Sequence, residues 1–420
     1  MKFTSLLRTL CLLAIVALPA WAQNFALKDG DRVVFYGDSI TDQRLYTTFA
    51  ETYVVTRFPK LDINFVHSGW GGDRVTGGGG GPIDLRLRRD VFAYKPDVMT
   101  IMLGMNDGSY RAFDQTIFDT YAKGYEHIVD SVKQTLPGIR ITVIEPSPFD
   151  DVTQPPKFEG GYNAVMVRYS QYVKELAEKE KLGLADLNTP IVAALEKAKA
   201  TDAELAKKII PDRVHPGPGG HLLMAEALLK SWNAPALVSA VEIDAGTKKV
   251  VDAQGTKVSG LKTGDEVSWM QLDESLPMPV DWNDPIVALA VASSDFIQAL
   301  NQQTLKVTGL SAANYVLKID GNEAGTFTKE QLAEGINLAT LPTPMAKQAA
   351  EVHKLTLQHN NIHFQRWRQV QVPLADNKTP KVQSAVKDLM TALDEEEAGV
   401  VKQQRAAAQP KPHQFQLVPK

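Results

Sequence analysis

Ser39 follows a short apolar run, in the stretch VVFYGDSITD. A serine hydroxyl becomes a nucleophile at neutral pH only when a neighbouring base accepts its proton. Two interpretations fit this position: an ordinary turn residue, or the nucleophile of an acyl-transfer reaction. The second interpretation requires a base, a carboxylate that orients the base, and hydrogen-bond donors for a developing oxyanion.

His215 is the strongest candidate for the base. It lies in IIPDRVHPGPGGH, a loop rich in proline and glycine, and Asp212 precedes it by three residues. This spacing allows the carboxylate to reach the ring nitrogen that faces away from the serine. A turn capped by Asp212 is the alternative. The other histidines are less suited: His221 is expected on a helix surface, and His359 and His363 are expected on a solvated helix face without a third metal ligand.

Candidate oxyanion donors follow two further apolar runs. Asn106 lies in LGMND and Gly72 lies in HSGWGGDRV. A side-chain amide and a peptide N–H are both groups that can meet developing negative charge, and glycine lets the backbone approach a reacting group closely. Each segment is also typical of an ordinary turn, so neither is decisive alone.

The elements that must position these residues read as alternating strand and helix over residues 23–235. Short continuous apolar runs are typical of parallel strands that are buried on both faces. The alternation predicts a doubly wound α/β sandwich, in which ligands bind at the carboxyl ends of the strands. The predicted strands are Arg32–Tyr36, Ile63–His67, Val98–Leu103, Ile139–Ile144 and Leu184–Asp186, with helices near 45–58, 116–135, 162–181 and 219–232.

The pattern changes after residue 235. Residues 236–340 are predicted to form a β-rich accessory domain, with Val287–Val291 among its strands, and residues 341–405 to form two long polar helices. Residues 406–420 are predicted to be a disordered tail. Trp269 and Trp282 fit either a carbohydrate-binding surface or a structural unit that braces the first domain, and we favour the second interpretation.

Residues 1–22 have the three-part pattern of a secretory signal peptide. Lys2 and Arg8 precede the apolar run Leu10–Leu18, which is too short for a transmembrane span. Ala20-Trp21-Ala22 then places two small residues two positions apart, as at a cleavage site. We therefore expect an exported protein, periplasmic or secreted, with no stable membrane anchor after cleavage. Cys11, the single cysteine, lies within this segment, so no disulfide or thiolate site is expected in the mature chain.

The charge balance makes nucleic acid an unexpected partner. The formal net charge is −4, and removal of Lys2 and Arg8 would make it −6. Nucleic-acid binding depends on clustered lysine and arginine, and the sequence has no long basic run.

Taken together, the four candidate segments resemble the SGNH or GDSL-type hydrolase family, in order and spacing, over about residues 30–232. GDSI, GWGGD, GMND and DRVH resemble its first, second, third and last sequence blocks. The resemblance implies a flavodoxin-like sheet and an esterase that needs no metal or cofactor. It implies Ser39 as nucleophile, His215 as acid–base and Asp212 as its orienting residue, with the oxyanion held by Ser39, Gly72 and Asn106.

The sequence also departs from the family pattern and leaves the substrate open. Ile40 replaces the usual leucine, and His67 stands where asparagine is frequent. The export signal and the lack of a long apolar cap favour short acyl groups, such as acetyl groups on a polysaccharide. Two alternatives remain: a lysophospholipase or thioesterase, and a non-catalytic binding protein on the same fold. Trp70, Tyr110 and Tyr162 are candidate substrate-binding residues.

Overall fold

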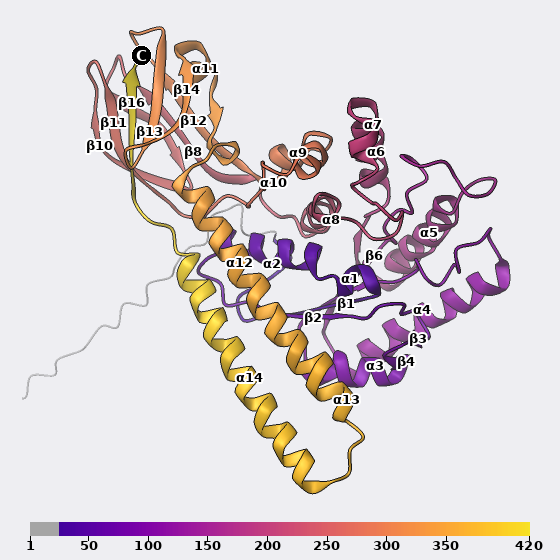
Figure 1. The fold of residues 1–420 in the computed structure, drawn as a ribbon. Helices are drawn as coiled ribbons and strands as arrows, with labels where there is room; N and C mark the ends of the chain where they lie inside the picture. Colours follow the sequence, from indigo (N-terminus) through magenta and orange to yellow (C-terminus); the bar gives the residue numbers. More distant parts are fainter. Residues whose placement is uncertain (1–24) are drawn as a thin grey trace, which may run out of the picture.

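The computed structural model describes residues 25–420 and is drawn in Figure 1. The predicted signal peptide, residues 1–22, lies outside the described residues. Within the described part of the chain, no helix is long and apolar enough to cross a membrane.

The first half of the chain is built on a five-stranded parallel sheet. Four of its strands carry unbroken runs of buried residues, which is why they read as continuous apolar segments in the sequence. The predicted doubly wound fold is confirmed. In spatial order the strands are β2 (Asn64–Gly69), β1 (Arg32–Gly37), β5 (Val98–Met102), β6 (Arg140–Ile144) and β7 (Gly183–Ala185).

Helices cover both faces of this sheet (Figure 1). Helices α2 and α8 pack together on one face, and α3, α4 and α5 lie on the other. Since β1 lies between β2 and β5, the winding reverses at β1, and a crevice is expected where β1 and β5 end. The helices are α1 (Ser39–Asp42), α2 (Leu45–Arg57), α3 (Ile83–Asp90), η2 (Phe92–Tyr94), α4 (Gln115–Thr135), α5 (Asn163–Glu180), α6 (Thr189–Thr201), α7 (Ala203–Ala206) and α8 (Pro218–Ser231).

Two further sheets form a β-rich unit that follows α8. One contains β10 (Thr256–Lys262), β11 (Val267–Asp273), β16 (His413–Pro419), β13 (Asn314–Ile319) and β14 (Asn322–Thr328) in that order. The other contains β15 (Ile336–Asn337), β12 (Gln302–Thr308), β8 (Leu237–Asp244) and β9 (Lys249–Gln254). Short helices α11 (Lys329–Glu334) and η3 (Leu338–Thr340) follow β14 and β15.

The predicted disordered tail, residues 406–420, is wrong. Its last residues form β16, which pairs with β11 on one side and β13 on the other, and Phe415 and Leu417 are buried in the core. Alternation of His413, Phe415 and Leu417 with polar residues points one face of the strand inward. The chain end therefore completes a sheet whose neighbouring strands lie about 100 residues or more earlier.

The predicted strand Val287–Val291 is also wrong, because this segment lies in helix α9 (Pro285–Ala292). Asp284 caps the helix by accepting from the backbone N–H groups of Ile286 and Val287, and Pro285 occupies its first turn. Helix α9 and α10 (Phe296–Leu300) pack against α8. Trp269 is buried and stacks on Phe415, whereas Trp282 is 39% exposed.

A long helical hairpin leaves the β-rich unit, runs along the α/β half of the molecule and returns to end in β16 (Figure 1). It consists of α12 (Pro344–Phe364), the π-helical segment η4 (Gln365–Gln371), α13 (Val372–Leu374) and α14 (Pro380–Ala407). Helix α12 packs against both α14 and α2.

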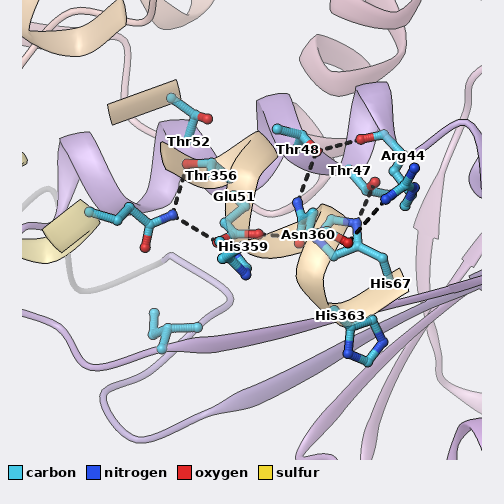
Figure 2. A network of polar contacts seen from close by, with 12 residues as sticks. Arg44, Thr47, Thr48, Glu51, Thr52, His67, Thr356, His359, Asn360 and His363 are labelled. Carbon is cyan, nitrogen blue, oxygen red and sulfur yellow. Dashed lines mark hydrogen bonds and ion pairs between the residues drawn. The ribbon is translucent and has the colours of Figure 1, made fainter. Parts of the chain in front are cut away.

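A buried polar network holds this hairpin on α2 (Figure 2). Glu51 of α2 accepts a hydrogen bond from His359 at 2.5 Å and from Gln404 at 2.9 Å, and its second oxygen contacts His67 at 3.1 Å. His359 and His363 were expected on a solvated face, but both are buried. Helices α14 and α2 cover two sides of α12. The spacing of polar residues along α12 therefore does not indicate which of them are exposed to solvent.

Candidate active site

Ser39, His215 and Asp212 come together at the carboxyl edge of the parallel sheet. Ser39 begins α1 immediately after β1, and its Oγ lies 2.8 Å from His215 Nε2. His215 Nδ1 lies 2.7 Å from Asp212 Oδ2. An ionised carboxylate can only accept, so Nδ1 carries the proton and Nε2 is left to accept the serine O–H. The side chains of His215 and Asp212 are 36% and 56% exposed, so the group opens to solvent.

The turn before α8 fixes this geometry locally. Asp212 Oδ1 accepts the backbone N–H groups of Val214 and His215, at 2.9 and 2.7 Å, while Oδ2 faces the imidazole. Burial would raise the pKa of Asp212, but the hydrogen bonds from His215 and Val214 outweigh it and lower this pKa. The carboxylate therefore stays ionised at neutral pH and holds one tautomer of His215.

Asp38 positions Ser39 from the preceding residue. Its carboxylate caps α1 by accepting the Ile40 N–H at 3.0 Å, and its side chain is buried. Burial, aided by the nearby carboxylates of Asp107 and Asp73, raises the pKa of Asp38 to about 7. These contacts give Asp38 a structural role at the start of α1.

The predicted oxyanion donors lie at the same carboxyl edge of the parallel sheet, which we call the rim. Gly72 follows β2 with φ of +77°, a conformation that favours glycine, and Asn106 follows β5. Asn106 Nδ2 donates to Asp73 O at 3.0 Å, which brings the amide beside the residue that follows Gly72. Within residues 25–420 the backbone N–H groups of Ser39 and Gly72 donate to no other protein group. Unpaired donors of this kind are available to a developing oxyanion.

Tyr110 orients Asn106, a role that the sequence did not indicate. The Tyr110 hydroxyl donates to Asn106 Oδ1 at 2.9 Å, so the amide nitrogen must face Asp73 O and the open site. Tyr110 itself is 43% exposed and remains available to a substrate. Tyr162 was predicted to contact substrate, but it is 2% exposed and donates to Met105 O behind the loop, so that expectation is corrected.

Trp70 is half-buried, and its ring is covered by other protein groups. The Arg368 guanidinium lies 3.4 Å from the ring centre, and Arg86 and Arg89 lie 5.2 Å from it. The glycine run folds into a ribbon of β3 (Gly77–Gly78) and β4 (Gly81–Pro82), and a Cβ on Gly80 would lie 2.7 Å from the Trp70 ring. Glycine at this position therefore allows the ribbon to pack closely on Trp70.

His221 and His67 are buried supports of the fold. His221 was expected on a helix surface, but it is fully buried, accepts the Tyr46 N–H and contacts Gln43. Burial lowers its pKa to about 3, so it stays neutral beside His215. His67 points away from the rim towards Thr47 and Glu51. Residues 25–420 contain no group of three or more His, Cys, Asp and Glu side chains able to hold a metal ion.

The arrangement can carry out acyl transfer. A hydroxyl bonded to a neutral imidazole, an imidazole oriented by a carboxylate, and unpaired N–H donors nearby supply the nucleophile, the base and the oxyanion donors. The four segments that carry these groups are separated by up to 176 residues, and the fold brings them to one rim.

Parts of this chain are similar to known proteins. Residues 35–223 match the sequence profile of the GDSL-like Lipase/Acylhydrolase family. An acetylxylan esterase of Geobacillus stearothermophilus is 27% identical over 226 residues, covering 48% of this chain and 93% of that protein. The solved structure of a gut microbial diltiazem-metabolizing enzyme is 28% identical with a TM-score of 0.81, covering 94% of this chain and 98% of that one.

The two relatives cover different parts of the molecule. The acetylxylan esterase matches about half of the chain, whereas the diltiazem-metabolizing enzyme also shares the β-rich unit and the helical hairpin. The matched family segment contains every residue of the rim described above. Residues 35–223 therefore form a GDSL-like lipase/acylhydrolase domain, and the chain that carries it is a carboxylic ester hydrolase.

Proposed function

We propose that this enzyme removes short acyl groups, in particular acetyl groups, from polar carriers through an acyl-enzyme formed on Ser39. The observation that carries the proposal is the relay in which Ser39 Oγ lies 2.8 Å from His215 Nε2 and His215 Nδ1 lies 2.7 Å from Asp212. Both distances are within the range required for proton transfer from a nucleophile to an oriented base.

In the proposed reaction, Ser39 Oγ attacks the ester carbonyl carbon while His215 Nε2 accepts the hydroxyl proton. The carbonyl oxygen becomes negative and is met by the N–H groups of Ser39 and Gly72 and by the Asn106 amide. His215 then returns the proton to the leaving alcohol as the C–O bond breaks. Water, activated by His215 in the same way, releases the acid and restores Ser39.

The preference for acetyl esters rests on the relatives and on the polarity of the site region. One relative is an acetylxylan esterase, and the other is a diltiazem-metabolizing enzyme. Arginine, aspartate and tyrosine side chains surround the rim, and the half-buried Trp70 is already covered by Arg368. Such surroundings suit a polar carrier such as a polysaccharide better than a long lipid chain.

Export is part of the proposal and rests on the sequence pattern of residues 1–22. On cell fractionation, the full-length chain should therefore be found outside the cytoplasm in a shortened form, and a variant that begins at Gln23 should stay in the cytoplasm. Accumulation of the full-length chain in the cytoplasm without shortening would contradict export, and it would leave the esterase proposal unaffected.

The catalytic assignment is tested with Ser39→Ala and p-nitrophenyl acetate. We expect kcat to fall by roughly 10⁴-fold or more, because the nucleophile is removed while the fold persists. Circular dichroism and Tm should match those of the wild type. Equal background rates for the two proteins would identify a non-catalytic binding protein and overturn the proposal.

The substrate assignment needs a separate panel. p-Nitrophenyl esters of increasing chain length, acetylated xylan, diltiazem, a lysophospholipid and an acyl thioester should be compared by kcat/KM. We expect the highest values for acetate esters. A preference for chains of about eight carbons or more, or for the lysophospholipid or thioester, would reject the acetyl assignment while leaving the roles of the rim residues intact.

A further inference from the structure

The C-terminal hairpin reaches the loop that carries Gly72. Arg368, in the π-helical segment Gln365–Gln371, lies with its Nη1 3.3 Å from Asp42 Oδ1 and 3.4 Å from Gly69 O. Its guanidinium carbon lies 3.4 Å from the centre of the Trp70 ring. One side chain of the C-terminal hairpin therefore contacts α1, the last residue of β2 and the first residue of the loop that follows.

Asp42 extends this contact towards Gly72. While Oδ1 of Asp42 faces Arg368, Oδ2 accepts the backbone N–H of Gly71 at 3.1 Å. The Trp70 N–H donates to Gly37 O at 3.0 Å, and the Asp73 N–H donates to Trp70 O at 3.1 Å. Every residue that flanks Gly72 in the loop is thus held by a contact, while the Gly72 N–H itself stays unpaired in the described part of the chain.

The neighbours of Arg368 fix its position from the hairpin side. Trp367 donates its indole N–H to Asp90 at 2.6 Å and meets Trp70 edge-on with ring centres 5.6 Å apart. Arg368 is 17% exposed, so its side chain has little freedom. A planar guanidinium can stack on an indole and donate in its own plane at once, which a lysine ammonium cannot do.

We propose that Arg368 is a positioning residue for the oxyanion side of the site. It acts through Trp70, Gly69 and Asp42 to hold the loop in the conformation that leaves the Gly72 N–H free for the acyl oxygen. This inference rests on the proposed function. It also assigns a role to the C-terminal hairpin, which lies beyond the segment matched to the family.

The expected effect is on turnover, not on stability. Partly exposed ion pairs contribute little to folding, and the two hydrogen bonds of Arg368 are long. A displacement of about 1 Å in an active site, by contrast, can lower a rate by about 100-fold. The interaction that is lost belongs to the transition state, so kcat should fall while KM changes little.

Arg368→Ala is the direct test, with Arg366→Ala as its matched control. Arg366 lies in the same π-helical segment, is 16% exposed and pairs with Asp394 of α14, so its loss removes the same charge from the hairpin without touching the loop. With p-nitrophenyl acetate we expect kcat of Arg368→Ala to fall by roughly 10- to 100-fold, with KM within a factor of about three. Arg366→Ala should keep the wild-type kcat.

Arg368→Lys keeps the charge and the aliphatic stem, and it covers the case in which the alanine variant is unstable. We expect an intermediate kcat, because the ammonium can reach Asp42 but cannot stack on Trp70 and bridge to Gly69 in one plane. Wild-type kcat in both Arg368 variants, or an equal loss in Arg366→Ala, would overturn the positioning role.

The test separates failure of this inference from failure of the proposed function. If wild-type hydrolysis depends on Ser39 but not on Arg368, the esterase proposal stands and the positioning role is rejected. If hydrolysis does not depend on Ser39, the esterase proposal is rejected, and any effect of Arg368 cannot be an effect on that reaction.

Discussion

An acid–histidine group at the rim and another in the interior differ in their access to solvent. At the rim, Asp212 and His215 lie beside Ser39, and their side chains are 56% and 36% exposed. In the interior, Glu51 lies between His67 and His359, all at most 2% exposed, and His67 contacts the hydroxyl of Thr47 at 2.7 Å (Figure 2). Both groups contain a carboxylate, an imidazole and a hydroxyl.

The difference shows that residue type alone does not make a catalytic group. At the rim, Nε2 of the His215 imidazole contacts the Ser39 hydroxyl near solvent, and unpaired N–H donors lie nearby. In the interior both oxygens of Glu51 are used by His359, Gln404 and His67, and the elements α2, β2, α12 and α14 meet there. The buried group joins the hairpin to α2, whereas the rim group is arranged for proton transfer.

Among the variants that compare these two groups, Asp212→Asn at the rim should have the largest effect. An amide can donate towards His215 Nδ1 and so stabilise the tautomer that no longer accepts from Ser39, which should lower kcat by about 10⁴-fold. Steady-state kinetics with p-nitrophenyl acetate measures the loss. The Tm should stay near that of the wild type, and unfolding of the variant would instead show that Asp212 is structural.

Glu51→Gln should have the opposite pattern. Removal of one charge takes from His359 the more deeply buried of its two carboxylate partners, Glu51 and Glu397. Loss of a buried partner typically costs about 3–5 kcal/mol of unfolding free energy. We expect urea unfolding to shift accordingly, while kcat of the folded protein stays within a factor of a few. Glu175→Gln, on the exposed side of α5, is the matched control and should change neither. If kcat of Glu51→Gln fell as much as that of Asp212→Asn, the buried group would also be required for catalysis, and the contrast between the two groups would be wrong.

Alkaline pH should weaken the buried group. Burial lowers the pKa of His359, but Glu51 and Glu397 outweigh it and raise this pKa from 6.5 to about 9. The folded state therefore holds this proton more tightly, so the stabilisation is fully present below pH 6.5 and is lost as the pH rises through about 9. We expect a loss of roughly 2–3 kcal/mol between these limits.

The matched variant for this pH effect is His359→Gln, which lacks the titrating group. Thermal unfolding from pH 6 to pH 10 should show a steeper decline in Tm for the wild type than for the variant. Parallel curves would mean that His359 does not carry the proton assigned to it. His67, whose pKa is lowered mainly by burial, should remain neutral over this range.

Tyr110→Phe is expected to have the smallest effect and refines the description of the rim. Loss of the hydroxyl leaves Asn106 Oδ1 without its donor, so the amide loses orientation, and we expect kcat to fall by about 5- to 10-fold. The KM for p-nitrophenyl acetate should change little if Tyr110 acts through Asn106. A large KM increase with unchanged kcat would identify Tyr110 as a substrate contact instead.

The strands of the parallel sheet could be predicted to within a few residues because they are buried on both faces. Val287–Val291 is an equally continuous apolar run, yet it forms a helix. The helix-start signals Asp284 and Pro285 precede it, but a short apolar run by itself does not distinguish a strand from a buried helix. The strand His413–Pro419 could not be recognised, because its pairing partners β11 and β13 are distant in sequence. Burial of His221, His359 and His363 depends on which helices cover them.

The sequence by itself determined the parallel α/β sheet and the rim residues Ser39, Gly72, Asn106, Asp212 and His215. Strand-helix alternation and short motifs are local properties, and parallel strands must end at a common edge. Only the tertiary structure decided the buried Glu51 network, the contact of Tyr110 with Asn106 and that of Arg368 with Trp70. Contacts across hundreds of residues arise from the docking of whole elements, for which no local pattern is required.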